Sequence, residues 1–190
     1  MSQAHLNSKL ALKDVLIPIN NSNSCLFHFD STLNSTQGIK PVFSKIRYIR
    51  DYINGSTANT SNHWVEIQAY DSNGVNLALG KTLTALTDGN INSSSFVSAS
   101  PGSQYVEIDL DSSNTGITYE ISYIKVWHYY ADSRTYHNNK TMVSHDRYHW
   151  ITVFDSDNEG EYQETVLGHL IDLTKSKYLY KDGKYDGCLG

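Results

Sequence analysis

Short stretches in which apolar and polar residues alternate follow one another from Ser44 onward, with turn residues between them. In Trp64–Tyr70 the apolar Val65, Ile67 and Ala69 alternate with polar residues, which is the period of a strand with one buried face. The polar residues between them are expected on the opposite face. The other segments expected to form strands are 46–53, 75–79, 104–110, 121–129, 139–144, 150–154, 162–166 and 169–173.

No long amphipathic helical pattern lies between these segments. The order of short strands and turns therefore predicts an all-β fold, an antiparallel β-sandwich or barrel. The composition agrees, because 14 tyrosines and a charged fraction of only 18% suit pleated, half-buried surfaces better than helices.

The two ends of the chain depart from this pattern. Met1–Phe43 contains apolar residues interrupted by Pro18 and by the polar run Asn20–Ser24. We expect it to be an arm that packs on a neighbouring subunit, because alone it could not offset its ordering entropy. Residues 44–175 are expected to form the sandwich domain, and residues 176–190 a short tail.

Charge and hydropathy exclude two classes of partner. The net charge of −5 and the pI of about 5.8 argue against nucleic acid, which requires a concentrated basic surface. No stretch approaches the roughly 18 apolar residues that span a bilayer, and the N-terminal residues lack a signal-peptide pattern. We expect synthesis in the cytoplasm without a signal peptide, and no membrane insertion. Cys25 and Cys188 are either two free thiols or a bridge that ties the ends of the chain together.

Six segments carry a family resemblance. Asn76–Thr82, Thr87–Asn90 and Tyr105–Leu110 resemble the opening of discoidin or coagulation-factor type C domains, and Ile121–Trp127, Met142–Asp146 and Trp150–Phe154 resemble their middle strands. These domains have the galactose-binding-like fold. The resemblance implies a jelly-roll β-sandwich, and many members of the family are carbohydrate-binding modules.

The order of the segments departs from that family. Ile46–Arg50 and His63–Ile67 resemble the stretch that normally closes such a domain, but here they come first. This order indicates either a circularly permuted domain or the junction of two tandem copies, the first of them cut short. Modules of this style also resemble those of bacteriophage and other virion proteins, which is a fold-level analogy.

The triplet Asp88-Gly89-Asn90 is a candidate calcium loop. Carboxylate, amide and carbonyl oxygens are the ligands that calcium prefers, although such triplets are also ordinary turns. The resemblance implies a structural calcium here, with Asp88 and Asn90 as side-chain ligands and Glu66 as the carboxylate from a neighbouring strand.

Aromatic and charged residues gather between the expected strands 121–129 and 139–144. Sugars stack on aromatic faces while charged side chains bind their hydroxyls, so this mixture suits a glycan site. The alternative is structural, with the charged pair bound to itself and the tyrosines packed against the sheet. The resemblance places ligands on the loops at one end of the sandwich. The candidate ligand-binding residues are Tyr130, Asp132, Arg134, Tyr136 and His137.

Two further polar segments are weaker candidates. Asn54–Trp64 is a long polar loop that suits ligand binding, but Trp64 is better explained as a core anchor. His145, Asp146 and His149 lie close together within one expected turn. None of the hydrolase, protease or nucleotide-binding motifs occurs, and we expect the protein not to be an enzyme.

The sequence thus predicts a non-enzymatic carbohydrate-binding or adhesion module. The expected setting is a virion, as a phage tail, fibre or capsid-surface component that contacts host glycans. Its expected partners are a cell-surface glycan and other virion subunits, which it would contact through Met1–Phe43 in an oligomer. The alternative is a purely structural assembly protein, in which the sandwich mediates subunit contacts without binding sugar.

Overall fold

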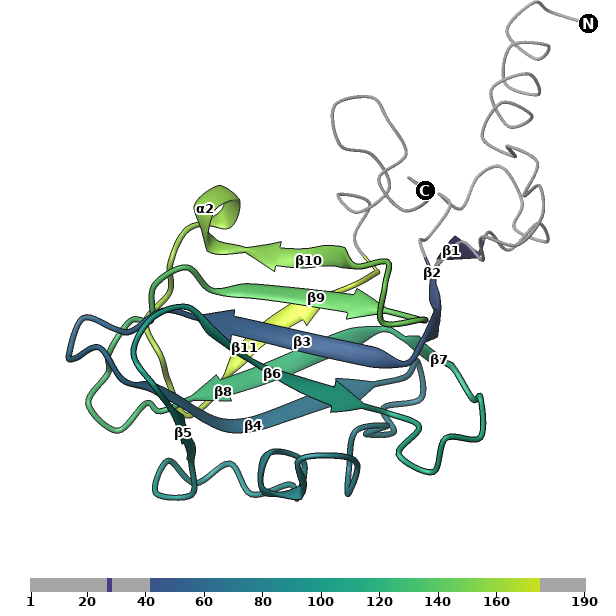
Figure 1. The fold of residues 1–190 in the computed structure, drawn as a ribbon, viewed down its shortest axis with the longest axis horizontal. Coiled ribbons are helices and arrows are strands. Elements are labelled where there is room, and N and C mark those ends of the chain that lie inside the picture. The colour runs from purple at the N-terminus through teal and green to yellow at the C-terminus, as the bar shows by residue number, and fades with distance from the viewer. Residues whose placement is uncertain (1–26, 29–41, 175–190) are drawn as a thin grey trace, which may run out of the picture.

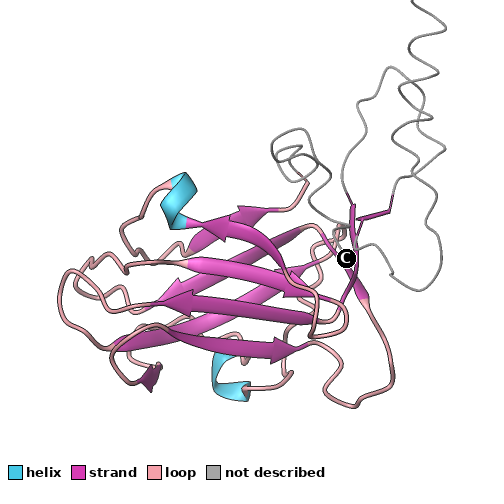
Figure 2. Cartoon of the chain, turned by 45° about the horizontal axis from the view of Figure 1, so that its top comes forward, coloured by secondary structure: helices cyan, strands magenta, loops and turns pink. Residues whose placement is uncertain are grey.

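The computed structural model describes residues 27–28 and 42–174, and these form an antiparallel β-sandwich (Figure 1). Both cysteines, the tail and most of the expected arm lie outside the described residues. Within the described part, the helical elements are the short η1 (Thr84–Leu86) and α2 (Ser156–Glu159), and Figure 2 shows them outside the sheets. The predicted fold class is confirmed.

Two four-stranded sheets form the layers, and every pairing is antiparallel. The first sheet has the order β10-β9-β3-β6 and the second has the order β11-β8-β4-β5. A third, smaller sheet has the order β1-β2-β7. The strands are β1 (Phe27–His28), β2 (Val42–Ile46), β3 (Tyr48–Ile53), β4 (Asn62–Tyr70), β5 (Val97–Ala99), β6 (Gln104–Asp109), β7 (Tyr119–Ile121), β8 (Tyr123–His128), β9 (Lys140–Ser144), β10 (Ile151–Asp155) and β11 (His169–Asp172).

The core lies between the two four-stranded sheets and follows the period of two along each strand. In β3, Ile49, Asp51 and Ile53 alternate with partly exposed residues and point inward. In β8, Ile124 and Val126 belong to the same core. The strands resembling the family's closing stretch, β3 and β4, are internal strands of the two sheets. The permutation itself stays a prediction.

The alternation expected in β4 is broken by an irregularity of register between Trp64 and Glu66. Trp64, Ile67 and Ala69 all join the core, as expected for Trp64. Glu66 lies on the other face but is also fully buried. One extra residue in a strand changes the face to which the following side chains point. A strict alternation of two residues does not predict this change.

Two expected strands, 75–79 and 162–166, are absent from the described fold, where those residues form turns with isolated bridges. In the first, the Asn76 side chain accepts hydrogen bonds from the backbone N–H groups of Ala69 and Ala78, and Val75 and Leu79 are more than half exposed. A side chain that binds the backbone in this way ends the ladder locally.

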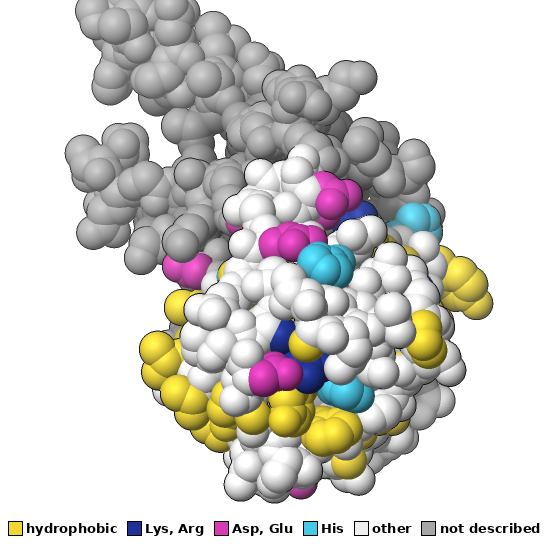
Figure 3. Space-filling view, turned by 90° about the vertical axis from the view of Figure 1, so that its left-hand side faces the viewer, with side chains coloured by type: hydrophobic (Ala, Val, Ile, Leu, Met, Phe, Trp, Pro, Cys, Tyr) yellow, Lys and Arg dark blue, Asp and Glu magenta, His cyan; other side chains and the backbone are white. Residues whose placement is uncertain are grey.

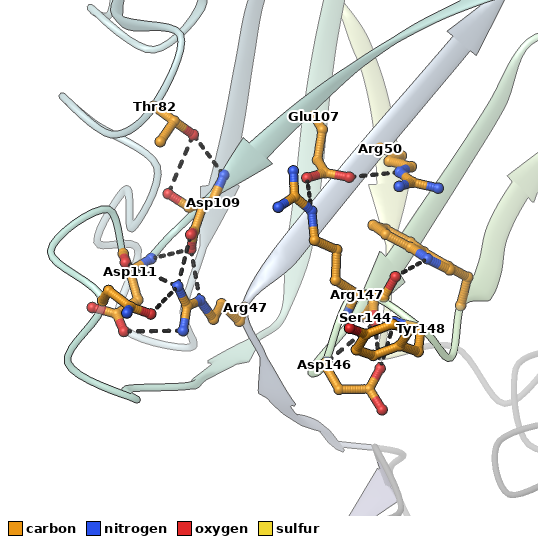
Figure 4. A network of polar contacts seen from close by, with 12 residues as sticks. Arg47, Arg50, Thr82, Glu107, Asp109, Asp111, Ser144, Asp146, Arg147 and Tyr148 are labelled. Carbon is orange, nitrogen blue, oxygen red and sulfur yellow. Dashed lines mark hydrogen bonds and ion pairs between the residues drawn. The ribbon is translucent and has the colours of Figure 1, made fainter.

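Ion pairs cover the outer face of the β10-β9-β3-β6 sheet (Figure 4). Glu107 of β6 pairs with Arg50 at 2.6 Å and with Arg147 of the β9–β10 turn at 2.7 Å. At the edge of this face, Arg47 donates two hydrogen bonds to Asp109, at 2.9 and 2.8 Å. These contacts join β3, β6 and the β9–β10 turn on the solvent side.

The first and last described segments of the sandwich, β2 and the end of β11, both lie next to residues 121–122. Phe43 of β2 pairs with Ile121 of β7, and the Leu173 N–H donates to the Ser122 carbonyl at 2.9 Å. Both contacts lie just before the first residue of β8. The small sheet therefore caps the end of the sandwich at which β8 begins. No helix among the described residues has the length and apolar character needed to cross a membrane.

Candidate functional site

Four loop segments converge at the opposite end of the sandwich, where β8 ends. Thr135 and Thr57 are joined by backbone and side-chain hydrogen bonds, and the Tyr130 hydroxyl donates to the Ile91 carbonyl at 2.9 Å. Gln163 bridges to Thr135 from the last segment. Figure 3 shows acidic, basic and histidine side chains together on this end, beside hydrophobic ones.

The centre of this end is a guanidinium held in one orientation. A turn closed by the Ser133 N–H and the Tyr130 carbonyl brings Asp132 and Arg134 together. Arg134 donates through Nε and Nη2 to the two oxygens of Asp132, at 2.8 and 2.6 Å. This bidentate pair fixes the guanidinium plane, and it lowers the pKa of Asp132. The Asp132 side chain is 43% exposed, whereas that of Arg134 is 6% exposed.

Aromatic rings surround the pair. The Arg134 guanidinium lies over the Tyr129 ring, 4.6 Å from its centre. His63 of β4 contacts both Tyr129 and Phe96, with ring centres 5.9 and 4.6 Å apart. Phe96 is 40% exposed. Burial lowers the pKa of His63 and the Arg134 charge lowers it further, so this imidazole is neutral at pH 7.

The five residues singled out from the sequence occupy different places. Asp132 and Arg134 form the central pair, and Tyr130 anchors its loop to Ile91. Tyr136 has 0% exposure and lies beneath the pair, so its ring is not presented to a ligand. His137 lies on the surface, paired with Glu161 at 3.0 Å. The structure adds three residues that were not named as ligand-binding residues: Phe96, and His63 and Tyr129, which lie in candidate segments of the sequence.

A charged cluster lies in the core directly below this end. His128, at the end of β8, has 0% exposure and contacts a carboxylate with each ring nitrogen. Its Nε2 is 2.8 Å from Asp51 and its Nδ1 is 2.7 Å from Glu164. Asp51 also accepts hydrogen bonds from Trp64 Nε1 at 2.9 Å and from the Thr141 hydroxyl at 2.7 Å.

The carboxylates keep His128 protonated. Burial disfavours the imidazolium, but the charges and hydrogen bonds of Glu164 and Asp51 outweigh it and raise the pKa of His128 to about 10. The cluster therefore holds one positive group between two carboxylates at neutral pH.

Part of this cluster can be predicted from the alternation of inward and outward residues along β3 and β8. Asp51 has the same parity as Ile49 and Ile53 in β3, and His128 has the same parity as Ile124 and Val126 in β8. An acid and a base on the inward faces of two strands are candidates for a buried pair. Glu164 gives no such signal, because it lies in a loop.

The candidate calcium loop meets Glu66 in the structure. Glu66 Oε1 accepts hydrogen bonds from the Gly89 N–H at 2.9 Å and from Gln68 at 3.2 Å, while its buried Oε2 makes none within the described part of the chain. Burial raises the pKa of Glu66, and the nearby charge of Asp88 raises it further. An unpartnered carboxylate oxygen beside a second carboxylate fits a cation.

The oxygen donors at this loop are few. Among the described residues, no group of three or more His, Cys, Asp or Glu side chains is placed to hold a metal. Calcium also binds amide and backbone carbonyl oxygens. Asp88, Asn90 and Glu66, together with loop carbonyls, therefore remain a chemically suitable set.

The other two candidate segments have structural explanations. In the β9–β10 turn, Asp146 binds the backbone N–H of His149 at 2.8 Å and its Nδ1 at 2.6 Å, so these groups close the turn. In the β3–β4 loop, Asn62 is buried and donates to the carbonyls of Ser100 and Gly102. The polar residues of both segments satisfy their own backbone or a neighbouring loop.

Comparisons with protein-family models, with curated proteins and with solved structures found no match to this chain.

Proposed function

We propose that this protein binds an uncharged glycan at the loop end of the sandwich, without transforming it. The observation that carries the proposal is the Asp132–Arg134 pair, fixed in a bidentate geometry and bordered by the rings of Tyr129, His63 and Phe96. A rigid polar pair beside exposed aromatic surface supplies both the hydrogen bonds and the stacking that a pyranose ring requires.

The charge balance of the site favours an uncharged sugar. Asp132 neutralises the guanidinium, and His63 is uncharged at pH 7, so no unpaired positive charge faces the solvent. A sialic acid or a sulfated sugar would place its negative charge beside the half-exposed Asp132, which is unfavourable.

A glycan array tests the proposal. Wild-type protein is expected to bind uncharged glycans in preference to sialylated and sulfated ones. Replacing Arg134 by Ala (R134A) removes the partner that fixes the half-exposed Asp132, so we expect binding to fall by about tenfold or more. Isothermal titration with the best glycan measures the loss.

The matched control is Arg147→Ala. Arg147 also pairs with a carboxylate, Glu107, but it lies on the β9–β10 turn and its side chain is 61% exposed. Its removal is expected to leave glycan binding unchanged. A wild-type protein that binds no glycan, or binds only acidic ones, contradicts the proposal.

We also propose that calcium binds at Asp88, Asn90 and Glu66 and stabilises the loop beside β4. The ion would supply the positive charge that the buried Glu66 oxygen lacks. The ion would not itself contact the Asp132–Arg134 pair, but it would steady Ile91, the residue after Asn90, whose carbonyl accepts the hydrogen bond from Tyr130.

The virion setting and the role of Met1–Phe43 in subunit contacts stay predictions, since most of that segment lies outside the described residues. They are separable from glycan binding by experiment. A stable oligomer that dissociates when Met1–Phe43 is deleted, with no glycan bound in either form, would favour the structural assembly role.

A further inference from the structure

Two carboxylates belong to the surroundings of Arg134: Asp132, on the solvent side of the guanidinium, and Glu164, on the core side. Outside, Asp132 occupies Nε and Nη2. Inside, Arg134 Nη1 is buried and makes no hydrogen bond within the described chain. The Glu164 N–H donates to the Arg134 carbonyl at 2.9 Å beside the antiparallel bridge between Thr135 and Gln163, so Arg134 and Glu164 are opposite each other and their side chains share a face. The second oxygen of Glu164, Oε2, is also buried and without a hydrogen bond among the described residues.

Tyr136 connects the two groups. Its ring centre lies 5.8 Å from the Arg134 guanidinium carbon and 5.1 Å from the centre of the His128 ring. Burial raises the pKa of the Tyr136 hydroxyl to about 12; the neighbouring Arg134, which interacts with this hydroxyl, lowers that pKa, and the charge of Glu164 raises it. Nη1 of Arg134 and Oε2 of Glu164, each buried and without a close hydrogen bond among the described residues, therefore both belong to groups that act on one phenol.

Without His128 the two carboxylates below the site would have no counter-charge. Asp51 and Glu164 bring these carboxylates into the core, and the imidazolium of His128 contacts both. A buried carboxylate without a counter-charge is strongly unfavourable. If His128 were uncharged, Glu164 would still be opposite Arg134, whose buried Nη1 has no close hydrogen bond among the described residues. Glu164 would then compete with Asp132 for the same guanidinium.

We propose that His128 is a positioning residue for Arg134: the imidazolium satisfies Glu164, which would otherwise compete for the guanidinium, and so leaves the guanidinium with Asp132 at the ligand end. This inference rests on the proposed function and deepens it, because Arg134 fixes the half-exposed Asp132 that is assigned to the glycan. The buried cluster sets the direction in which the Asp132–Arg134 pair is held, without touching the ligand.

Nitrogen-detected NMR of the arginine side chains tests this without any ligand. An Nε–H held by a carboxylate exchanges slowly with water and gives a resolved signal. We expect the Arg134 signal to shift or disappear in His128→Gln (H128Q) and to return to its wild-type position in the double variant H128Q/E164Q. The signals of Arg47 and Arg50, whose Nε groups donate to Asp109 and Glu107, serve as internal controls and are expected not to move.

The double variant separates positioning from mere structural support. Each substitution removes buried contacts. If these contacts only supported the structure, their losses would add, and the Arg134 signal would be more disturbed in H128Q/E164Q than in H128Q. The positioning role predicts the opposite, because removing Glu164 removes the competitor. An Arg134 signal that is unchanged in H128Q, or that is not restored in H128Q/E164Q, overturns the inference.

A second pair of variants decides the question if H128Q does not fold. In Asp132→Asn (D132N) the outer carboxylate is lost, and we expect Arg134 to turn inward to Glu164 and keep a slowly exchanging, shifted Nε–H. In D132N/E164Q neither carboxylate remains, and that signal is expected to be lost to exchange. Identical spectra for D132N and D132N/E164Q would show that Glu164 does not compete for Arg134.

Glycan binding gives the second readout. H128Q is expected to weaken binding by about tenfold or more, as R134A does, and H128Q/E164Q to restore most of it. If no variant and no wild-type protein binds a glycan while the NMR pattern appears as expected, the proposed function fails and the positioning of Arg134 stands. Normal glycan binding by H128Q would overturn the inference and leave the proposed function intact.

Discussion

At the scale of single residues, the central fact is a histidine that contacts a carboxylate through each ring nitrogen inside the core. His128 is linked to Asp51 on one side and to Glu164 on the other. Because both contacts favour the charged ring, the folded protein holds a proton at His128 well above the ordinary pKa of 6.5. The stability of the fold is therefore tied to that proton.

This link predicts how stability depends on pH. The folded-state pKa of about 10 lies above the unfolded value of 6.5, so the contribution is complete below pH 6.5 and is lost as the pH rises to about 10. Within this window we expect the free energy of unfolding to fall by about 1 kcal/mol per pH unit from this group. Urea unfolding at a series of pH values measures the slope.

The reference for that slope is H128Q/E164Q, which lacks the titrating ring and its second carboxylate. The difference between the two proteins isolates His128 from the tyrosines and lysines that titrate near pH 10. Parallel curves for the two proteins between pH 6.5 and 10 would contradict the assignment.

At the scale of elements, the contact between β8 and the loop before β11 depends on a glycine. Gly168 has a φ of +68°, and a Cβ at this position would lie 2.5 Å from Cε2 of Trp127. Trp127 in turn donates through Nε1 to the Val166 carbonyl at 2.9 Å. The loop lies flat on the indole only because residue 168 has no side chain.

Replacing Gly168 by Ala is expected to be strongly destabilising for two reasons. The positive φ costs roughly 1–2 kcal/mol, and overpacking against the indole adds about 1–3 kcal/mol. Gly74→Ala is the matched control, because Gly74 has a φ of +78° but no atom within 4 Å of the added Cβ. Denaturant unfolding should show a clearly larger loss for Gly168→Ala, and equal losses would refute the close-contact argument.

Local periodicity was sufficient to predict most of these elements. The segments around β3, β4, β6 and β8–β11 all carry strand patterns in the sequence, and the structure has strands there. It failed at 75–79 and 162–166, where side chains bind backbone groups, and at the β4 irregularity. These features depend on single hydrogen bonds or one added residue, which a periodic pattern does not encode.

The candidate site was predictable only where it is local in sequence. Asp132 and Arg134 are two residues apart, and their pairing was weighed from the sequence as the structural alternative. His63 and Phe96 reach the same place from segments remote in the chain, and their ring contacts result from the sheet order. Tyr136 is buried, which agrees with the alternative that the tyrosines of this segment pack against the sheet; in a loop, the strand period does not tell which residues point inward.

At the scale of the whole molecule, calcium is expected to stabilise the native state. A ligand that binds only the folded protein raises its free energy of unfolding, by about 3 kcal/mol when the ligand is about a hundredfold above its Kd. The Tm measured by calorimetry should rise when calcium is added and fall with a chelator. In Glu66→Gln we expect that rise to be largely lost.

Glu120→Gln is the control for this measurement. Glu120 is an exposed carboxylate of β7, and its loss is expected to leave the calcium response intact. A wild-type Tm that does not respond to calcium or to chelator would exclude the assignment of Asp88, Asn90 and Glu66.

The place where the described chain enters and leaves the sandwich has a consequence for any larger assembly. Phe43 and Leu173 both meet the short stretch Ile121–Ser122 that precedes β8, whereas Tyr129 and the loops of the proposed site follow its far end. The described chain therefore enters and leaves the domain at the pole opposite the proposed binding surface (Figure 1). Copies held side by side at that pole would all present the proposed surface outward, and simultaneous contacts through several copies would bind more tightly than one contact alone.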